Sequence, residues 1–526
     1  MSNSFTPPTL IRRNSSQSYK QSHLSPDVNI LRSNRVATNV RDMDSLYYRG
    51  QSVIDSDDLE AVTPILLETG KSSSVLTSTI DLCNTILGTG IVSLPYAFST
   101  VGLGLGCVIV VLSIIGTWFT LRLLVLSAEI THGNAENPVP RILVESDGEA
   151  SYSSISNTIL SPYLAKLSDI FVGIACFGFA VSYVVSIGDC MPQVVIDLIP
   201  DDSINTMFMS ILTNRYFWMI VFLIIIIPLT CAKSVDEFWW FSGTALICAL
   251  YLGFVIPYES FKSQDLYDPT KEPISIIHIS PDTIQCIPIF IFAFTCHQNI
   301  FTIYKDINAD YKSPQQLDHS KISHIHSVID LSVVFVGSLY MIIGIIGYIT
   351  FGSNTSMIVL DNYPKSTPIL IGRLCYSSLA ALSFPIQAHP CRVSIDSLLG
   401  TIFDLDGLGA YEEISSEVTD SYFPRRWCFQ RKYFSTEQGR RISSSITIIV
   451  LAYTCAFLVP HLEMILVFVG ATGGVIMCYI LPCVFYCNVT RPNEHTSWKR
   501  IFSIIIAILA GLCGMLQILS LFINIE

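Results

Sequence analysis

The sequence predicts an all-α integral membrane protein with eleven transmembrane helices. Charged residues make up 14% of its 526 residues, well below the roughly 25% of a typical soluble protein. Mean hydropathy is +0.52, and the apolar residues gather into runs of about the 20 residues that a helix needs to cross a bilayer. The net charge of −12 comes without a long basic block, which excludes nucleic-acid binding because neutralising phosphates requires clustered Lys and Arg.

The helices are predicted from intervals that lack Asp, Glu, Lys and Arg, since an ionised side chain at mid-membrane is costly. There are ten such intervals: 82–121, 170–188, 216–232, 238–258, 283–304, 331–360, 374–391, 442–462, 464–490 and 501–525. The first holds 40 residues, and Gly102, Gly104 and Gly106 mark a turn inside it. It is therefore predicted to form two helices, the second ending near Ala128, which gives eleven in total.

The chain is predicted to have two parts. Residues 1–74 are rich in Ser, carry 8 basic and 8 acidic residues and show no apolar period, so they are expected to form a disordered cytoplasmic tail that is open to regulatory contacts. The tail lacks the basic start and apolar core of a signal peptide, so the first membrane helix is expected to direct insertion. Residues 75–526 are predicted to form the membrane domain.

The distribution of Lys and Arg predicts the orientation. With the N-terminus in the cytoplasm, the connections and flanks on that side carry 17 of these residues and those on the other side carry 5. The C-terminus then lies outside the cell or in a lumen, because the helix count is odd.

The first predicted helix contains residues that interrupt helices. Gly88 and Gly90 are followed by Pro95, and lipid offers no hydrogen bonds to the backbone groups that a break releases. Such a break is tolerated beside a cavity, where free N–H groups attract a carboxylate and free carbonyls suit a cation or ammonium group. The alternative is a glycine notch that lets two helices pack closely.

The sixth predicted helix has a second anomaly, because residues 295–299 place Thr, Cys, His, Gln and Asn in an apolar span. Polar side chains at this depth are expected to face a polar cavity or partner. Interruptions in the first and sixth of at least ten helices are what two inverted five-helix repeats would produce, with a binding site between them.

Four segments of these helices resemble the amino acid/auxin permease family. They are 84–98 (NTILGTGIVSLPYAF), 294–299 (FTCHQN), 384–386 (FPI), and 469–471 with 481–482 (VGA and LP). Within the family they are most similar to fungal-type vacuolar amino acid transporters and sodium-coupled neutral amino acid transporters. The resemblance implies a leucine-transporter-like 5+5 inverted repeat plus one extra helix, and coupled amino acid transport by alternating access.

The resemblance also implies roles for individual residues. The substrate would bind at the two breaks, within the set Asn84, Thr85, Gly88, Thr89, Gly90, Ile91, Phe294, Thr295, Cys296 and His297. In sodium-coupled members an Asn of the first helix and a hydroxyl residue of the eighth hold the ion, which match Asn84 and Ser378, or Ser377 if the alignment shifts. Amide and hydroxyl oxygens suit Na+, whereas vacuolar relatives use protons, so the coupling ion is H+ or Na+.

Three titratable residues are candidates for proton coupling. His297 has an unperturbed pKa near 6.5 that would let it titrate against an acidic lumen, although a neutral histidine satisfied by a neighbouring carbonyl is the favoured interpretation. Asp189 and Glu463 are the acidic alternatives. Both lie near a membrane interface, where a solvated or capping role is expected.

The sequence predicts neither an enzyme nor a resident metal or other cofactor. His324 and His326 lack a Cys or carboxylate group at metal-ligand spacing, and no nucleophile elbow or catalytic triad pattern occurs. Most of the 16 Cys fall inside apolar spans, where they are expected to pack as small residues. Cys190 and Cys286 both approach the non-cytoplasmic side, where a disulfide is an open alternative.

These observations predict a secondary active transporter that moves amino acids from the lumen of a vacuole or lysosome to the cytoplasm, coupled to protons. Two alternatives are an amino-acid sensor, whose tail signals to a partner, and a sodium-coupled transporter of the plasma membrane. A channel is disfavoured, because it needs a continuous polar stripe and the polar residues cluster at two breaks instead.

Overall fold

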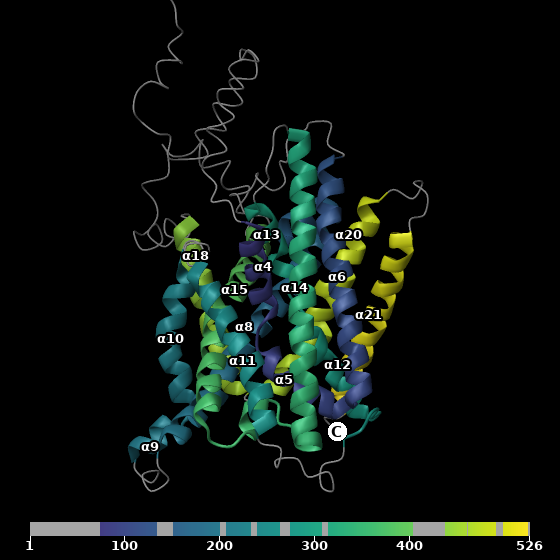
Figure 1. The fold of residues 1–526 in the computed structure, drawn as a ribbon. Coiled ribbons are helices and arrows are strands. Elements are labelled where there is room, and N and C mark those ends of the chain that lie inside the picture. The colour runs from purple at the N-terminus through teal and green to yellow at the C-terminus, as the bar shows by residue number, and fades with distance from the viewer. Residues whose placement is uncertain are drawn as a thin grey trace, which may run out of the picture. The chain divides into compact units, whose positions relative to one another are not determined.

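The computed structural model describes nine ranges of the chain, all within the compact unit Lys71–Glu526: 74–133, 151–199, 207–232, 239–262, 274–307, 314–402, 437–459, 461–490 and 498–523. Apart from Ser74, the predicted disordered tail lies outside the described residues. The described ranges are helical and contain no β-strand (Figure 1). This confirms the prediction of an all-α protein.

The helices follow one another along the chain with short turns between several of them. In order they are α4 (Val75–Ile86), α5 (Gly90–Val101), α6 (Leu103–Gly133), α7 (Tyr152–Ile159), α8 (Pro162–Leu198), α9 (Met207–Leu212), α10 (Arg215–Cys231), α11 (Trp239–Lys262), α12 (Pro281–Ala293), the 3-10 turn η4 (His297–Asn299), α13 (Ile300–Asp306), α14 (Pro314–Phe351), the 3-10 turns η5 (Gly352–Asn354) and η6 (Val359–Asn362), α15 (Thr367–Ile402), α18 (Glu437–Leu458), α19 (Leu462–Val469), the π-helical turns η7 (Gly470–Gly474) and η8 (Ile476–Ile480), α20 (Leu481–Val489) and α21 (Trp498–Ile523).

The candidate membrane spans agree with the predicted intervals. Nine helices of the described ranges are long and apolar enough to cross a membrane, and α4 with α5, bent by 51° at their break, make a tenth. The apolar helix α10 has 17 residues, or about 26 Å at 1.5 Å per residue, slightly less than the roughly 30 Å hydrocarbon core. The total of eleven spans stays a prediction that depends on α10.

The ends of α14 differ from the ends of the charge-free interval that predicts it. This helix starts at Pro314, well before the interval that begins at 331, and it ends at Phe351, before that interval does. Its 38 residues exceed the length needed to cross a bilayer, so its polar first turns can extend beyond the apolar layer. After Phe351 the chain forms the 3-10 turns η5 and η6.

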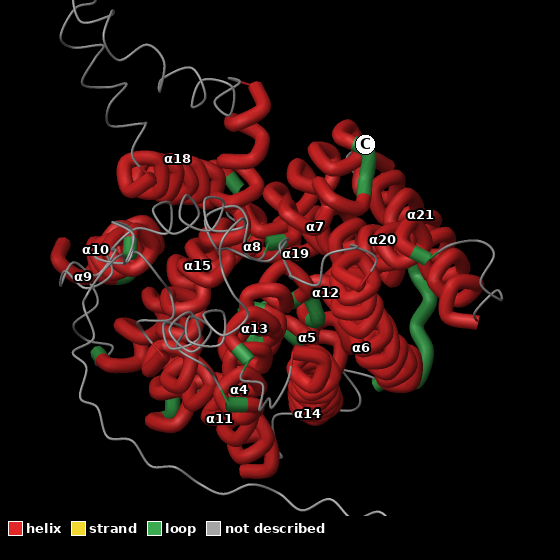
Figure 2. Tube along the Cα trace, turned by 90° about the horizontal axis from the view of Figure 1, so that it is seen from above, coloured by secondary structure: helices red, strands yellow, loops and turns green. Residues whose placement is uncertain are grey.

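The helices of the membrane unit form two groups. In the first group, α8 packs antiparallel along α15, and α10 and α18 pack against both of them. In the second group, α14 packs against α4, α5 and α6, and α12 packs against α5. α11 contacts α15 in the first group and both α14 and α4 in the second (Figure 2).

A buried ion pair joins α8 to α15 at the end where α15 begins. The Arg373 guanidinium contacts the Asp197 carboxylate, with side chains only 4% and 6% exposed, and it donates a second hydrogen bond to the carbonyl of Leu360 at 3.0 Å. One turn away, the Tyr376 hydroxyl lies 2.9 Å from that of Ser186. These contacts fix the relative register of the two long helices.

Removing one partner of the buried pair is expected to destabilise the protein. Asp197→Ala leaves the Arg373 charge buried without its carboxylate, so the free energy of unfolding should fall by about 3–5 kcal/mol. The apparent melting temperature of the detergent-solubilised protein measures this loss. The double variant Asp197→Ala/Arg373→Ala should lose less than the sum of the two single variants, and strict additivity would contradict the interpretation.

Candidate functional site

The two predicted helix breaks are present and meet each other. α4 ends at Ile86 and α5 starts at Gly90, while α12 ends at Ala293 and the turn η4 starts at His297. A β-carbon at Gly90 would lie 2.8 Å from the Ala293 Cβ and 2.9 Å from its Cα. Only glycine allows the start of α5 to approach the end of α12 so closely.

The first break leaves a helix start without a side-chain cap. Thr89 is the N-cap residue of α5, but its side chain does not accept a hydrogen bond from the first amides of that helix. Its hydroxyl lies 3.4 Å from that of Ser182 on α8 instead. Backbone N–H groups at an uncapped helix start attract a carboxylate.

Two tyrosines from other helices enclose the first break. The Tyr340 hydroxyl of α14 donates to the Ile86 carbonyl at 2.8 Å. The Tyr183 hydroxyl of α8 would lie 3.0 Å from a β-carbon at Gly88, and it is close to the side chains of Ser383 and Gln387 on α15. The break is therefore surrounded by polar groups of three helices, while Thr85 bonds back to the Asp81 carbonyl and Ile91 is buried.

The second break is held by side chains of its own residues. The Thr295 hydroxyl donates to the Ile291 carbonyl at 2.8 Å, the ring nitrogen Nε2 of His297 lies 2.8 Å from the Thr120 hydroxyl, and the Gln298 amide donates to Gln387 at 2.8 Å. His297 is completely buried. This contact gives Nε2 a partner, but the other ring nitrogen, Nδ1, is buried and has no hydrogen-bond partner among the described residues, so the interpretation of His297 as a satisfied histidine stays a prediction.

Several buried polar atoms near the breaks lack a protein partner. The Asn84 side chain is 1% exposed, and neither its oxygen nor its nitrogen has a hydrogen-bond partner among the described residues. The same holds for the Gln298 oxygen, the Asn299 nitrogen and the Ser383 hydroxyl. Because a buried polar group without a partner is costly, these atoms indicate where a polar or charged ligand would bind.

The predicted ion ligands on α15 lie at a different depth from Ser383. Ser377 is buried beside Cys190 of α8, and Ser378 is partly buried. Six residues separate Ser377 from Ser383, or about 9 Å along a helix, and it is Ser383 that lies beside Tyr183 and the first break. The described contacts therefore associate Ser383, which no local sequence signal marks, with the level of the break.

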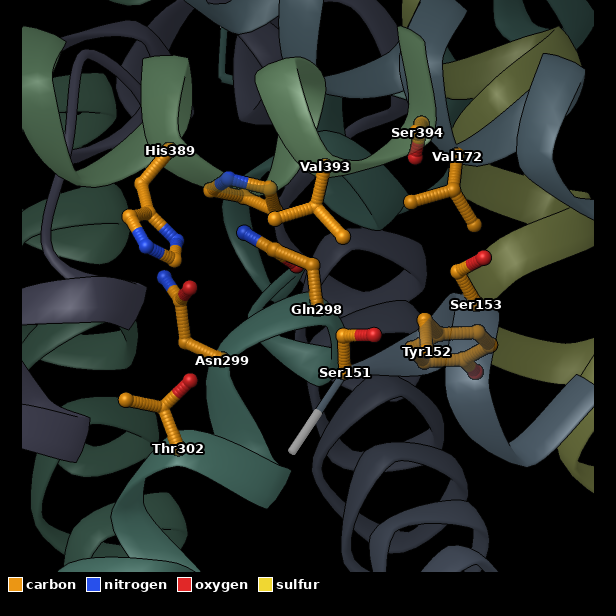
Figure 3. Close-up of a pocket in the computed structure, with 11 residues that line it drawn as sticks. Ser151, Tyr152, Ser153, Val172, Gln298, Asn299, Thr302, His389, Val393 and Ser394 are labelled. Carbon is orange, nitrogen blue, oxygen red and sulfur yellow. The ribbon is translucent and has the colours of Figure 1, made fainter. Parts of the chain in front are cut away.

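A pocket opens directly beside the second break. Figure 3 shows Gln298 and Asn299 on its wall, with Ser151 and Ser153 from α7 and His389 from α15. The space enclosed by these residues is narrow, with room for about one water molecule. The pocket lies toward the end of α15, because His389, Val393 and Ser394 on its wall belong to the C-terminal half of that helix.

The opposite side of the unit is held by charged and polar contacts. Asp189 forms an ion pair with Arg215 of α10 at 3.1 Å, and Glu463 accepts a hydrogen bond from Tyr96 at 2.6 Å. These two acidic candidates therefore join helices, and Glu463 also lies in the first turn of α19. Cys190 and Cys286 are free thiols that contact different carbonyls, those of Arg373 and Ala97, so they do not form a disulfide.

The carboxyl of Asp361 lies in turn η6, next to the Arg373–Asp197 pair. The side chain of Asp361 is exposed, but desolvation by the surrounding protein raises its pKa to about 6, with the Arg373 charge opposing this shift and the negative charges of Asp189 and Asp197 adding to it. An ordinary aspartate has a pKa near 3.9. This acid therefore changes charge within the range between a neutral and an acidic compartment.

The family model for transmembrane amino acid transporter proteins matches residues 71–524 of this chain. The chain belongs to this family. The family is one of transporters, and the resemblance found in the sequence motifs is confirmed by the match and by the relatives below.

Two relatives illustrate the range of this family. Vacuolar amino acid transporter 5 of Schizosaccharomyces pombe is 29% identical over 460 residues, which are 85% of this chain and 93% of the relative. Sodium-coupled neutral amino acid symporter 2 of Danio rerio is 23% identical over 460 residues, or 82% and 78% of the two chains.

A solved structure of Mhp1 in an inward-facing conformation is also similar to this chain. It aligns with a TM-score of 0.47 at 12% identity and covers 86% of this chain and 89% of that one. The leucine-transporter-like inverted repeat stays a prediction from the sequence.

Substitution at the contact between the two breaks should abolish transport. Gly90→Ala places a methyl group less than 3 Å from the Ala293 backbone, so the two half-helices must separate and amino acid uptake should fall at least tenfold. Gly243→Ala on α11 is the matched control, because a β-carbon there meets no atom within 4 Å. Uptake per protein in the membrane is the measurement, and equal uptake by both variants would disprove the importance of this contact.

Replacing Asp361 by a neutral residue is expected to stabilise the protein by an amount that depends on pH. A carboxyl whose pKa is raised by folding binds its proton more tightly in the folded protein, so its ionisation destabilises the fold as pH rises from about 4 to 6. Asp361→Asn should therefore raise the apparent melting temperature. The full increase is expected above pH 6, and it should disappear as the pH falls toward 4. Asp282→Asn on α12 is the control, because Asp282 lies away from the Arg373–Asp197 pair, and a gain independent of pH would contradict the assignment.

Proposed function

We propose that this protein transports amino acids from the lumen of a vacuole or lysosome to the cytoplasm, coupled to the movement of protons. The observation that carries the proposal is the close contact between the two interrupted helices at Gly90 and Ala293, next to a polar pocket. Membership of an amino acid transporter family and the vacuolar names of several relatives support it.

The two breaks offer complementary groups for an amino acid. The uncapped amides at the start of α5 would bind the substrate carboxylate. The ammonium group would bind carbonyls that the end of α12 releases around Phe294, Thr295 and Cys296. Since both breaks are formed by backbone groups, they recognise the part that all amino acids share, and side-chain selectivity comes from the neighbouring walls.

Sodium coupling is the alternative within the same class of protein. The observation that supports it is the buried Asn84 amide without a described partner, because amide and hydroxyl oxygens are hard ligands that suit Na+. Ser377 and Ser378 are the hydroxyl residues that the family resemblance proposes, and Ser383 lies nearer to the level of the break. With sodium as the coupling ion, the plasma membrane becomes the expected location.

Flux measurements on purified protein in liposomes test the proposal. The vesicles are loaded with a panel of labelled amino acids, and efflux is followed with an inside-acid pH gradient and, separately, with an inside-high Na+ gradient. We expect the pH gradient to accelerate efflux of the substrates severalfold and Gly90→Ala to abolish it. Acceleration by Na+ alone, lost in Asn84→Ala, would overturn proton coupling, and saturable binding without flux would overturn transport itself.

A further inference from the structure

A buried carboxylate lies behind the wall of the pocket, outside the two helix breaks. Asp169 of α8 is 1% exposed. Its oxygen Oδ2 is 2.7 Å from the Ser397 hydroxyl of α15 and 3.0 Å from the Ser153 hydroxyl of α7, and both hydroxyls donate to it. Its other oxygen, Oδ1, is buried and has no hydrogen-bond partner among the described residues.

Among the described residues, no cation forms a salt bridge with this carboxylate. The groups that face it are the hydroxyls of Ser153 and Ser397, and the Asn157 amide of α7 reaches the Ser153 hydroxyl at 3.4 Å. Other charged residues of these two helices are Lys166 on α8 and Arg392 and Asp396 on α15; the interactions that affect the Asp169 carboxyl are burial and the hydrogen bonds from Ser397 and Ser153. A buried carboxylate without a cation is costly, which requires that something else balance its charge.

We propose that Asp169 is a proton-binding site that communicates with the pocket through Ser153, and that its charge controls how firmly α7 is held across the pocket. Ser153 lines the pocket (Figure 3) and bonds to Asp169 directly. A proton from pocket water binds the Ser153 oxygen while the hydroxyl hydrogen of Ser153 moves to Oδ2 of Asp169. Hydronium becomes water, the carboxylate becomes a carboxylic acid, and no other reactant is needed.

The ligand of this site is a proton rather than a larger cation. Asp169 has almost no accessible surface, so an ammonium group or a metal ion would have to displace Ser153. In addition, the Ser153 and Ser397 hydroxyls both donate their hydrogens to Oδ2 of Asp169. A cation bound at Oδ2 would face these hydrogens rather than the hydroxyl lone pairs that could coordinate it.

Helix α7 links α8 and α15 to α13 and the turn η8 beside the pocket. On one side, Ser153 bonds to Asp169 of α8 and lies 3.0 Å from the Ser397 hydroxyl of α15. On the other side, the Tyr152 hydroxyl donates to the Met477 carbonyl at 2.8 Å, and the Tyr152 ring packs edge-on against Phe301 of α13. Hydrogen bonds to a charged carboxylate are about twice as strong as neutral ones, so protonation of Asp169 loosens one end of this bridge.

Hydrogen exchange of the backbone amides of α7, corrected for the intrinsic effect of pH, tests the proposal on the whole protein. In the wild type we expect protection of residues 152–159 to fall about tenfold as the pH is lowered and Asp169 is protonated. Asp169→Asn should show the low protection at every pH. Asp282→Asn is the matched control and should behave as the wild type does.

Two results would overturn the proposal: protection of α7 that does not change with pH in the wild type, and pH-dependent protection that persists in Asp169→Asn. If Asp169→Asn does not fold, Ser397→Ala serves instead. It keeps the carboxylate but removes one donor to its charged form, so the midpoint of the change should move to higher pH. An unchanged midpoint in Ser397→Ala would likewise contradict the proposal.

A transport measurement extends the test and rests on the proposed function. The rate of exchange of labelled for unlabelled amino acid across liposome membranes is measured from pH 5 to pH 8. In the wild type this rate should change with the same pH midpoint as the protection of α7, and in Asp169→Asn it should not depend on pH. A pH profile unchanged in this variant would overturn the proposal. Absence of any flux in the wild type would instead contradict the proposed function, while hydrogen exchange still decides the role of Asp169.

Discussion

Backbone hydrogen bonds that a membrane helix gives up must be recovered from other groups, and this constraint shapes the centre of the protein. α4 and α5 are separated by a break, and α12 ends four residues before the turn η4 begins. Each break is surrounded by hydroxyl and amide side chains from helices of both groups, such as Tyr340, Thr120 and Gln387. The interrupted helices persist because the rest of the bundle supplies these partners.

The two sides of the unit are held by different sets of contacts. Next to the second break, the wall consists of serines, amides and a histidine around a narrow space. At the opposite side, ion pairs such as Arg373–Asp197 and Asp189–Arg215 join α8 to its neighbours. The pocket side also has an ion pair, between Arg122 of α6 and Asp330 of α14 at 2.6 Å, so charged contacts join helices on both sides.

The sequence predicts the helices and both breaks, because glycine, proline and polar residues in an apolar span are local signals. It does not identify Tyr183, Tyr340 or Ser383, since these residues reach the first break from helices about 90 to 300 positions away and nothing in their own segments marks them. Ends of helices were also missed at α14, where polar turns extend the helix beyond the apolar interval. The sequence also does not show that Cys190 and Cys286 stay apart, because two residues at the same depth in the membrane need not be in contact.

The sequence does not single out Asp169, for a different reason. It stands immediately before the charge-free interval 170–188, so it served only to mark where a span begins. Ser153 lies in the short helix just before this span, but its contact with Asp169 depends on the turn between α7 and α8, and the sequence does not predict the geometry of that turn.

The central claim is that the two facing breaks form the binding site for an amino acid. A cryo-electron microscopy structure of the protein with a transported amino acid tests it most directly. The account predicts density for the substrate between Gly88–Gly90 and Phe294–His297, with its carboxylate at the start of α5. Substrate density elsewhere, with the two breaks still in direct contact and no ligand between them, would contradict it.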